Sequence, residues 1–351
     1  MSALLIYGAN GYTGGLIAGL AGEYGIKPIL AGRDAVAVAA LAESLGLERR
    51  AFAVSDAAKH LHGVSVVLNC AGPFSITYAP MVRACIERRI HYLDITGEIG
   101  VLEGIAAFDA DARKAGVMLL PGSGFDVVPT DCLAAHVAQR LPGAKCLFLG
   151  ISGTGRLSRG TMTTALEKSG AGGQVRRGGR IISVPAAWRT RNIDFGNGVR
   201  SAVTIPWGDV ATAFHSTGIP DIEVYASVPR GTRVAMRASR WLGWLLQRDA
   251  VRTRLQQRIR NAPAGPSERE LAEGESRVWA RAENDSGGAV ESIMKGPNGY
   301  LLTAHSALLA ARRVLAGDIT IGFQTPSRAF GADFALEIPG TMRWDVSRRS
   351  R

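Results

Sequence analysis

The chain has 351 residues, of which 46% are hydrophobic and 20% are charged. These proportions are typical of a soluble globular protein. No apolar run approaches the roughly 18 residues that a membrane-spanning helix needs. The first apolar segment begins too early to leave room for a signal peptide, so we expect a cytoplasmic protein.

The net charge of +11 is unevenly placed along the chain. Residues 1–143 carry 11 basic and 13 acidic side chains, whereas residues 144–351 carry 30 basic and 17 acidic ones. The basic excess therefore belongs to the second part, and the length favours two domains. We expect a first domain over residues 1–143, completed by a helix over 301–315, a second domain over 144–300, and a C-terminal segment over 316–351.

Strand-like and helix-like segments alternate over residues 1–143. Short apolar, β-rich strings are separated by helices of about 10 to 15 residues, which is typical of a parallel, doubly wound sheet. The strings expected to form strands are residues 3–7, 28–32, 50–54, 64–70, 91–95 and 117–120. The sequence therefore predicts a Rossmann-type α/β domain, whose ligands bind in a crevice beyond the carboxyl ends of the strands.

A glycine-rich turn joins the first predicted strand to the first predicted helix. A dinucleotide-binding turn needs one residue at positive φ, a second without Cβ so that the main chain can approach a pyrophosphate, and a third that lets helix and strand pack closely. The phosphates then meet the unpaired N–H groups at the helix start. The residues expected to bind them are Gly8, Asn10, Gly11, Tyr12, Thr13 and Gly14.

The second predicted strand ends at Gly32 and is followed by Arg33 and Asp34. The residue at this point faces the adenosine ribose of a bound dinucleotide. An acidic side chain there accepts from the 2′-hydroxyl of NAD, whereas a guanidinium can bind the 2′-phosphate of NADP. Because Arg33 comes first, the sequence favours NADP; the alternative is that Arg33 is a solvated loop residue paired with Asp34.

The loop after the fourth predicted strand carries small residues where the main chain must pass close to a flat ring. Ala71 and Gly72 would approach the nicotinamide ribose, and Pro73 would fix the turn. The residues expected to contact the cofactor on this and the following loop are Asn69, Ala71, Gly72, Pro73, Phe74 and Gly97.

Two carboxylates, Glu98 and Asp126, follow the fifth and sixth predicted strands and are expected to border the same crevice. A hydride acceptor also needs a proton, and a carboxyl group partly shielded from water can hold one near neutral pH. Glu98 and Asp126 are therefore the candidate catalytic residues. The alternative interpretation is that each of them only caps the helix that follows.

Several familiar catalytic motifs are missing from the sequence. There is no Tyr-x-x-x-Lys pair, no G-x-x-x-x-G-K-[ST] loop and no G-x-S-x-G elbow. These absences argue against the usual acid of short-chain dehydrogenases, NTP hydrolysis and the common serine hydrolase design. His60 and His62 are the only close histidine pair, and the four cysteines show no C-x-x-C spacing, so we expect no metal site.

Beyond residue 142 the chain changes to strand-rich segments with glycine and proline punctuation. Strands are expected at residues 146–152, 181–188, 203–206 and 222–228. Helices are expected to start near Thr161 and near Arg237 and to span residues 301–315, the last one packing back on the first domain.

Residues 230–260 hold nine arginines and a single acidic residue, Asp249. On a helix, one side would carry most of the apolar side chains, namely Trp241, Trp244, Leu245, Val251, Leu255 and Ile259. A helix of this kind over 237–260 could lie in an anionic membrane interface, gaining roughly 1 kcal/mol per basic residue. It could equally dock an acidic carrier protein, or pack on the protein's own core or on the partner in a homodimer. Nucleic acid is not an expected partner, because the charge is not interleaved with stacking aromatics on a recognisable module.

In combination, several of these segments resemble the saccharopine dehydrogenase-like oxidoreductases. The resemblance rests on residues 8–14, 69–74, 92–98 and 121–129, and extends to 158–161, 205–208, 216–220 and 299–300. Within that group the chain is most similar to the trans-acting enoyl reductases of polyketide lipid assembly. Saccharopine reductases themselves tend to carry Tyr where this chain has Gly97 and Glu98.

The resemblance implies NADPH bound by residues 8–14 and Arg33, and a second, mixed-sheet domain that closes over the nicotinamide with residues 158–161 near the substrate. From it and the residues above we expect an NADPH-dependent reductase of a C=C or C=N bond in a largely apolar, small-molecule or carrier-bound substrate, for example an enoyl thioester. Two alternatives stay open: a reductase of amino-acid imines, and a cofactor-holding protein of lipid surfaces without turnover.

Overall fold

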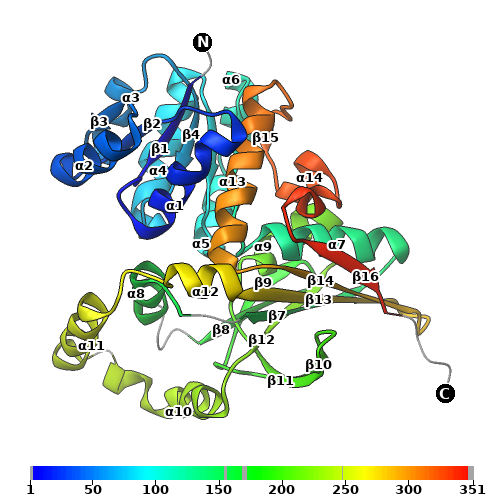
Figure 1. Ribbon diagram of the computed structural model, residues 1–351. Coiled ribbons are helices and arrows are strands. Elements are labelled where there is room, and N and C mark those ends of the chain that lie inside the picture. Colours follow the sequence, from blue (N-terminus) through cyan, green and yellow to red (C-terminus); the bar gives the residue numbers. More distant parts are fainter. Residues whose placement is uncertain (1–2, 154–155, 168–171, 247, 347–351) are drawn as a thin grey trace. The chain divides into compact units, whose positions relative to one another are not determined.

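The computed structural model describes residues 3–153, 156–167, 172–246 and 248–346 (Figure 1). The chain forms two compact units. The first unit comprises Met1–Val128 together with Tyr300–Pro339, and the second comprises Pro129–Gly299 together with Gly340–Arg351. Each unit has its own sheet.

The first unit contains a seven-stranded, all-parallel sheet, which confirms the predicted Rossmann-type fold. The strand order is β15-β6-β5-β4-β1-β2-β3. The strands are β1 (Ala3–Tyr7), β2 (Ile29–Gly32), β3 (Arg49–Ala51), β4 (Val64–Asn69), β5 (His91–Asp94), β6 (Met118–Leu120) and β15 (Gly322–Phe323). The central strands are buried on both faces because helices cover them, which explains their unbroken apolar sequences.

The helices of this unit lie between its strands along the chain, except α14, which follows the last one. They are α1 (Tyr12–Leu20), α2 (Ala35–Leu45), α3 (Ala57–His60), α4 (Phe74–Arg88), α5 (Ile99–Ala106), α6 (Asp109–Ala115), α13 (Gly299–Leu315) and α14 (Pro326–Phe330). One face of the sheet packs against α4, α5 and α6 through fully buried side chains such as Met81, Ile105 and Ala112. Helix α13 reaches the 3-10 turn that follows α1, where the Tyr24 hydroxyl lies 2.8 Å from Nδ1 of His305.

The division of the chain differs from the expected one at two places. The first unit ends at Val128, not near residue 143, because α7 (Val128–Arg140) is held by the second unit. Its Arg140 lies 2.8 Å from the Asp345 carboxylate and donates to the Ser292 hydroxyl. The segment 316–351 is not one piece either: it supplies β15 to the first sheet and β16 (Met342–Asp345) to the second.

The second unit is built on a mixed sheet, in which β10-β11-β12-β7-β13-β14-β16 follow one another. Among the strands of the described residues, only β12 and β7 are paired in parallel; the other pairs, including those of β8 with β12 and β9, are antiparallel. The strands are β7 (Cys146–Gly153), β8 (Gly173–Arg177), β9 (Arg180–Val184), β10 (Thr190–Asp194), β11 (Val199–Thr204), β12 (Asp221–Ser227), β13 (Glu275–Glu283), β14 (Ala289–Pro297) and β16. The second unit is therefore the mixed-sheet α+β domain that the sequence predicted.

Within the second unit, α8 (Arg159–Glu167) begins as the sequence predicted, with the Ser158 hydroxyl accepting from the Thr161 amide at 3.2 Å. The other helices are α9 (Asp209–Thr217), α10 (Arg230–Leu246), α11 (Asp249–Asn261) and α12 (Glu268–Glu273).

The basic stretch does not form the single helix over 237–260 that was expected. Arg248 has extended backbone (φ −68°, ψ 130°) immediately before α11, so α10 and α11 are separate helices. The structure describes neither residue 247 nor the side chains of residues 241–246. The prediction for Trp241, Trp244 and Leu245 therefore lies outside the described part of the chain. Among the described residues, no helix combines the length and the apolar character needed to cross a bilayer.

Candidate active site

The turn after β1 has the geometry of a phosphate cradle. Gly8 has φ +82°, and a Cβ on it would lie 2.7 Å from the Ala71 amide nitrogen in the loop after β4. A Cβ on Gly14 would collide with the carbonyl oxygen of Gly8 and lie 2.9 Å from Cα of Ala9. Neither position can therefore accept a side chain without moving the main chain. The glycines hold the turn close to both its own helix and the neighbouring loop.

The start of α1 is open to an anion. Its cap position is Gly11, which has no side-chain acceptor, so no side chain caps the first amides from that position. The next two residues of the predicted cradle, Tyr12 and Thr13, form the first turn of the helix and are partly exposed. Helix N-termini favour negative charge through their unpaired N–H groups and the peptide dipoles. A dinucleotide pyrophosphate fits this site.

Asn10 and Arg33 lie together at the end of β2. The Asn10 side chain packs on Gly32, whose Cβ, if present, would be 2.9 Å from Oδ1 of Asn10. Arg33 is exposed and, within the described residues, forms no ion pair. The Asp34 carboxylate instead caps α2 by accepting from the Ala37 amide at 3.0 Å. The alternative in which Asp34 neutralises Arg33 is therefore not what the structure shows, and the guanidinium is available to an anionic ligand.

The loop after β4 is shaped by Asn69, which is fully buried. Its Oδ1 accepts from the Ala71 amide at 3.1 Å, and its Nδ2 donates to the Thr77 hydroxyl at 3.2 Å. The Thr77 hydroxyl donates in turn to the carbonyl of Ala71 at 2.7 Å. Asn69 is thus a residue that shapes the loop from beneath, whereas Ala71 to Phe74 form its partly exposed rim.

Asp94, at the end of β5, ties three of the crevice loops together. Its Oδ1 accepts from the amides of Thr96 at 3.0 Å and Gly122 at 2.8 Å, and its Oδ2 accepts from the Tyr92 hydroxyl at 2.8 Å. The Tyr92 hydroxyl also accepts from Nδ2 of Asn69 at 3.3 Å. One buried carboxyl group therefore connects the ends of β4, β5 and β6.

The Asp94 carboxyl is completely buried, and this burial raises its pKa to about 6. The hydrogen bonds from Gly122, Thr96 and Tyr92 oppose that shift, and the nearby charge of Glu98 adds to it. Asp94 was not among the residues singled out from the sequence. The signal available was an acidic residue ending an apolar strand, directly before a loop already assigned to the crevice.

The two candidate catalytic carboxylates lie on adjacent loops. A Cβ on Gly97 would be 2.6 Å from Oδ2 of Asp126, so the Asp126 carboxylate lies directly over Gly97, the residue before Glu98. Glu98 is 9% exposed and occupies the cap position of α5, but its side chain makes no capping hydrogen bond. Capping by the side chain therefore does not account for Glu98. The Asp126 carboxylate can occupy this position only because residue 97 is a glycine and has no side chain.

Helix α13 contributes contacts that the site predictions did not contain. The Thr303 hydroxyl accepts from the Phe125 amide at 3.0 Å, and the Ser306 hydroxyl donates to the carbonyl of Ser123 at 2.7 Å. Tyr300 packs edge-on against Tyr12, with the ring centroids 5.3 Å apart. The helix thereby holds the loop after β6 and contacts the first residue of α1.

Comparisons with known proteins agree with this geometry. Residues 4–120 match the family model described as the saccharopine dehydrogenase NADP binding domain. The match covers the glycine turn, Arg33, the Asn69 loop and Glu98, and it assigns a nicotinamide cofactor, NADP, to the first unit. The cofactor expected from the sequence is confirmed.

Relatives with curated names match over shorter stretches. A saccharopine dehydrogenase-like oxidoreductase from Bos taurus is 35% identical over 80 residues, which are 22% of this chain and 19% of the bovine protein. The lipid droplet localized protein of Caenorhabditis elegans is 24% identical over 149 residues, or 36% of this chain and 34% of the nematode protein. The matches thus span about a fifth to a third of these relatives.

Among solved structures, the apo saccharopine dehydrogenase (L-Glu forming) from Saccharomyces cerevisiae is similar over 99% of this chain and 100% of its own, with a TM-score of 0.66 and 14% identity. At this identity the similarity concerns the fold: a parallel Rossmann-type sheet and a second, mixed sheet in one chain.

Proposed function

We propose that the chain is an NADPH-dependent oxidoreductase that reduces a C=C or C=N bond of a largely apolar substrate, such as an enoyl thioester. The observation that carries the proposal is the cradle formed by Gly8, Gly14 and the uncapped start of α1, followed along the sheet edge by the exposed Arg33. When bound, the cofactor supplies the hydride. The chain must supply binding, orientation and a proton.

Glu98 and Asp126 are the proposed proton donors. Glu98 follows β5, which neighbours β4 in the sheet, and Asp126 follows β6, the next strand along; Glu98 is largely shielded from water. Asp94 has a different role, since its oxygens are engaged by Tyr92 and two backbone amides, and it fixes the loops that carry the donors.

A second candidate is the reduction of amino-acid imines. It is supported by the names of the relatives and of the yeast structure, which refer to saccharopine dehydrogenase. A charged amino-acid adduct needs charged partners for its carboxylates, and the basic second half of the chain could offer them. The same cradle and the same two carboxylates would serve either reaction.

A peripheral lipid association is the third proposal. The nematode relative is named for its localisation on lipid droplets. On α11 the chain has a hollow of about 470 Å³ lined by Val251, Arg254, Leu255 and Arg258. Apolar side chains flanked by arginines on a helix suit an anionic interface. Flotation with vesicles with and without anionic lipid tests this association separately from turnover.

The enzymatic proposal is tested by following NADPH oxidation at 340 nm with a panel of enoyl thioesters and a panel of amino-acid imines. Turnover of the thioesters supports the first candidate, and turnover of the imines supports the second. Glu98→Gln and Asp126→Asn should each be assayed beside Glu87→Gln, an exposed carboxylate on α4.

General acid catalysis contributes about 10²- to 10⁴-fold to a rate, so loss of the donor should lower kcat by about that factor. The Glu87→Gln variant should match the parent chain. If NADPH binds tightly and no panel member is turned over, the oxidoreductase proposal fails and the lipid-surface interpretation is favoured. If turnover is normal in both site variants, neither carboxylate is the donor.

A further inference from the structure

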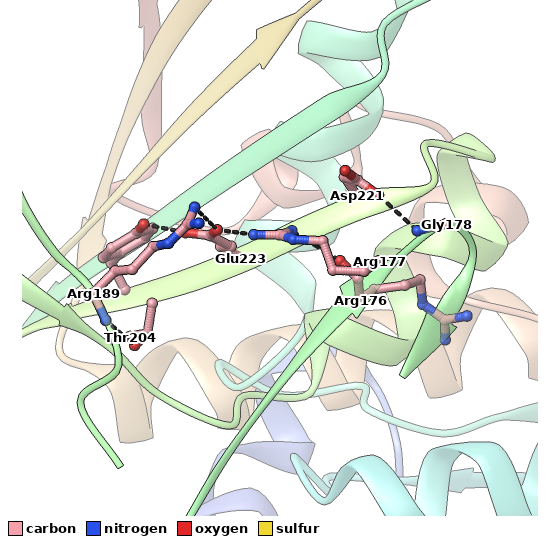
Figure 2. Close-up of polar contacts among 8 residues, drawn as sticks. Arg176, Arg177, Gly178, Arg189, Thr204, Asp221 and Glu223 are labelled. Carbon is pink, nitrogen blue, oxygen red and sulfur yellow. Dashed lines mark hydrogen bonds and ion pairs between the residues drawn. The ribbon is translucent and has the colours of Figure 1, made fainter. Parts of the chain in front are cut away.

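A second group of charged side chains lies in the second unit, around Glu223 in the middle of its sheet (Figure 2). Glu223 is on β12 and is completely buried. Its Oε2 accepts from the Tyr225 hydroxyl, and its Oε1 accepts from Arg177 and from Arg189, the latter at 2.8 Å. In Figure 2 the two guanidinium groups reach the one carboxylate from opposite sides.

This arrangement carries more positive than negative charge. One guanidinium is enough to compensate the charge of Glu223, yet two share it, and their side chains are 26% and 52% exposed. Arg191 is on β10, and its guanidinium lies 5.7 Å from the ring centroid of Tyr225, whose hydroxyl donates to Glu223. Within the described residues, Arg191 contacts aromatic rings and no carboxylate. The group around Glu223 thus holds more guanidinium groups than the charge of this one carboxylate requires.

The guanidinium groups lie over aromatic rings. Arg189 lies 4.2 Å from the centroid of the Trp188 ring, and Arg177 lies 5.7 Å from the same centroid. Arg191 lies 4.0 Å from the centroid of Phe148 and 5.7 Å from that of Tyr225, the residue that also binds Glu223. Stacking fixes the plane of a guanidinium and leaves its N–H edges for acceptors.

Most donors of these arginines are not used inside the described part of the chain. A guanidinium has five N–H donors. Arg189 donates from its side chain only to Glu223, and no side-chain hydrogen bond of Arg191 is found within the described residues. Because these side chains are already positioned, a ligand that accepts from them would lose little additional side-chain entropy on binding.

We propose that Arg177, Arg189 and Arg191 form a binding site for a phosphate-type oxyanion, on residues separate from the cofactor cradle. A phosphate group is anionic, and its several oxygens can accept paired hydrogen bonds from more than one guanidinium. Glu223 and Tyr225 orient the arginines from beneath. The phosphate could belong to a small soluble molecule or to a lipid headgroup.

The alternative is that the arginines only compensate the buried carboxylate. That requirement explains Arg177 or Arg189, because an uncompensated buried charge is strongly destabilising. It does not explain Arg191, which lies on aromatic rings and forms no ion pair within the described residues. Arg191 is therefore the residue that separates the two interpretations.

The test is a titration of the NADPH-saturated protein with inorganic phosphate at constant ionic strength, read by calorimetry. Saturation with NADPH keeps phosphate out of the cradle in the first unit. Arg191→Gln is the principal variant because it leaves both ion pairs of Glu223 in place. Arg269→Gln is the matched control, since Arg269 is 83% exposed and is paired with Glu273 on α12. Thermal melts without phosphate verify that each variant is folded.

We expect Arg191→Gln and Arg189→Gln each to weaken phosphate binding about tenfold, as loss of a charge-assisted contact does. The Arg269→Gln control should bind as the parent chain does. A parallel experiment uses phosphatidylcholine vesicles with and without phosphatidic acid. If Arg191→Gln loses binding to the vesicles that contain phosphatidic acid, the phosphate belongs to a lipid headgroup. If it loses binding only to free phosphate, the phosphate belongs to a soluble molecule. The proposal is overturned if Arg191→Gln and the control bind both probes alike, or if chloride replaces phosphate without change.

Discussion

Replacing Tyr92 with Phe isolates the network that holds the crevice loops together. The ring of Tyr92 is fully buried in β5, so Phe fits its space and removes only the hydroxyl. That hydroxyl donates to Oδ2 of Asp94 and accepts from Nδ2 of Asn69. The substitution therefore removes the side-chain link between Asn69 and Asp94 and leaves the pairing of β4 with β5 and the packing of the core in place.

The magnitude follows from the two lost hydrogen bonds. A hydrogen bond to a charged group contributes about 1.5 to 3 kcal/mol, and a neutral one about 0.5 to 1.5 kcal/mol. The bond to Asp94 is of the first kind above a pH of about 6, where this carboxyl is ionised. The bond from Asn69 is long, at 3.3 Å, and belongs to the weaker kind. We expect Tyr92→Phe to lower the free energy of unfolding by about 2 to 4 kcal/mol at pH 7.

The assay is urea unfolding combined with a fluorescence titration with NADPH. Tyr7→Phe is the control: Tyr7 is 3% exposed in β1, and its hydroxyl makes one neutral hydrogen bond, to the carbonyl of Phe52 at 3.2 Å. It should lose about 1 kcal/mol of stability, with unchanged NADPH affinity. Tyr92→Phe should also weaken NADPH binding, because the Asn69 loop is released. Equal effects of the two substitutions on stability and on affinity would refute the role given to the network.

Three further outcomes are expected. Gly14→Ala should abolish NADPH binding, because the added Cβ would collide with the Gly8 carbonyl. The control is Gly19→Ala, whose added Cβ has nothing within 4 Å; this variant should bind NADPH normally and gain up to about 1 kcal/mol of stability, as NADPH titration and urea unfolding can verify. Arg33→Ala should weaken NADPH binding roughly 10- to 150-fold and leave NADH binding unchanged, and an unaltered ratio of dissociation constants would contradict the assignment. The third outcome concerns pH. The pKa of Asp94 in the folded chain, about 6, lies above its ordinary value of 3.8, so the folded state binds a proton that the unfolded state has already lost. As pH rises from about 4 to about 6.5, the parent chain should therefore lose about 3 kcal/mol of stability relative to Asp94→Asn. Parallel pH profiles of the two proteins in urea unfolding would speak against this.

The first unit could be predicted from the sequence because its signals are local. The turn from Gly8 to Gly14 directly follows a buried strand and begins a helix, and every step of that argument concerns neighbouring residues. Arg33 was placed by the same reasoning, from its position after the second strand. The two-residue strand β15 could not be found in this way, because its partner β6 is about 200 residues away and so short a segment has no periodicity of its own.

The supporting residues of the site depend on register, which one sequence does not reveal. Asp94 and Asn69 face each other only because β4 and β5 pair with these residues opposite one another. Thr303 reaches Phe125 because α13 returns to the first unit after the entire second unit. Contacts of this range need the folded chain.

In the second unit the long hairpin of β13 and β14 was missed, although its sequence alternates. Arg277, Trp279 and Arg281 lie on one side of β13, and Val278 and Ala280 lie on the other. The arginines hid the pattern, because they interrupt the apolar residues on one side of the strand. The same holds for Arg191, a charged residue whose neighbours are aromatic rings.

The central claim is that the first unit holds the pyrophosphate of NADP at the start of α1. Hydrogen exchange of the amides in residues 8–14, measured with and without NADPH, tests it most directly. The account predicts that NADPH slows exchange in this segment and that the effect disappears in Gly14→Ala. Exchange that is the same with and without saturating NADPH would contradict it.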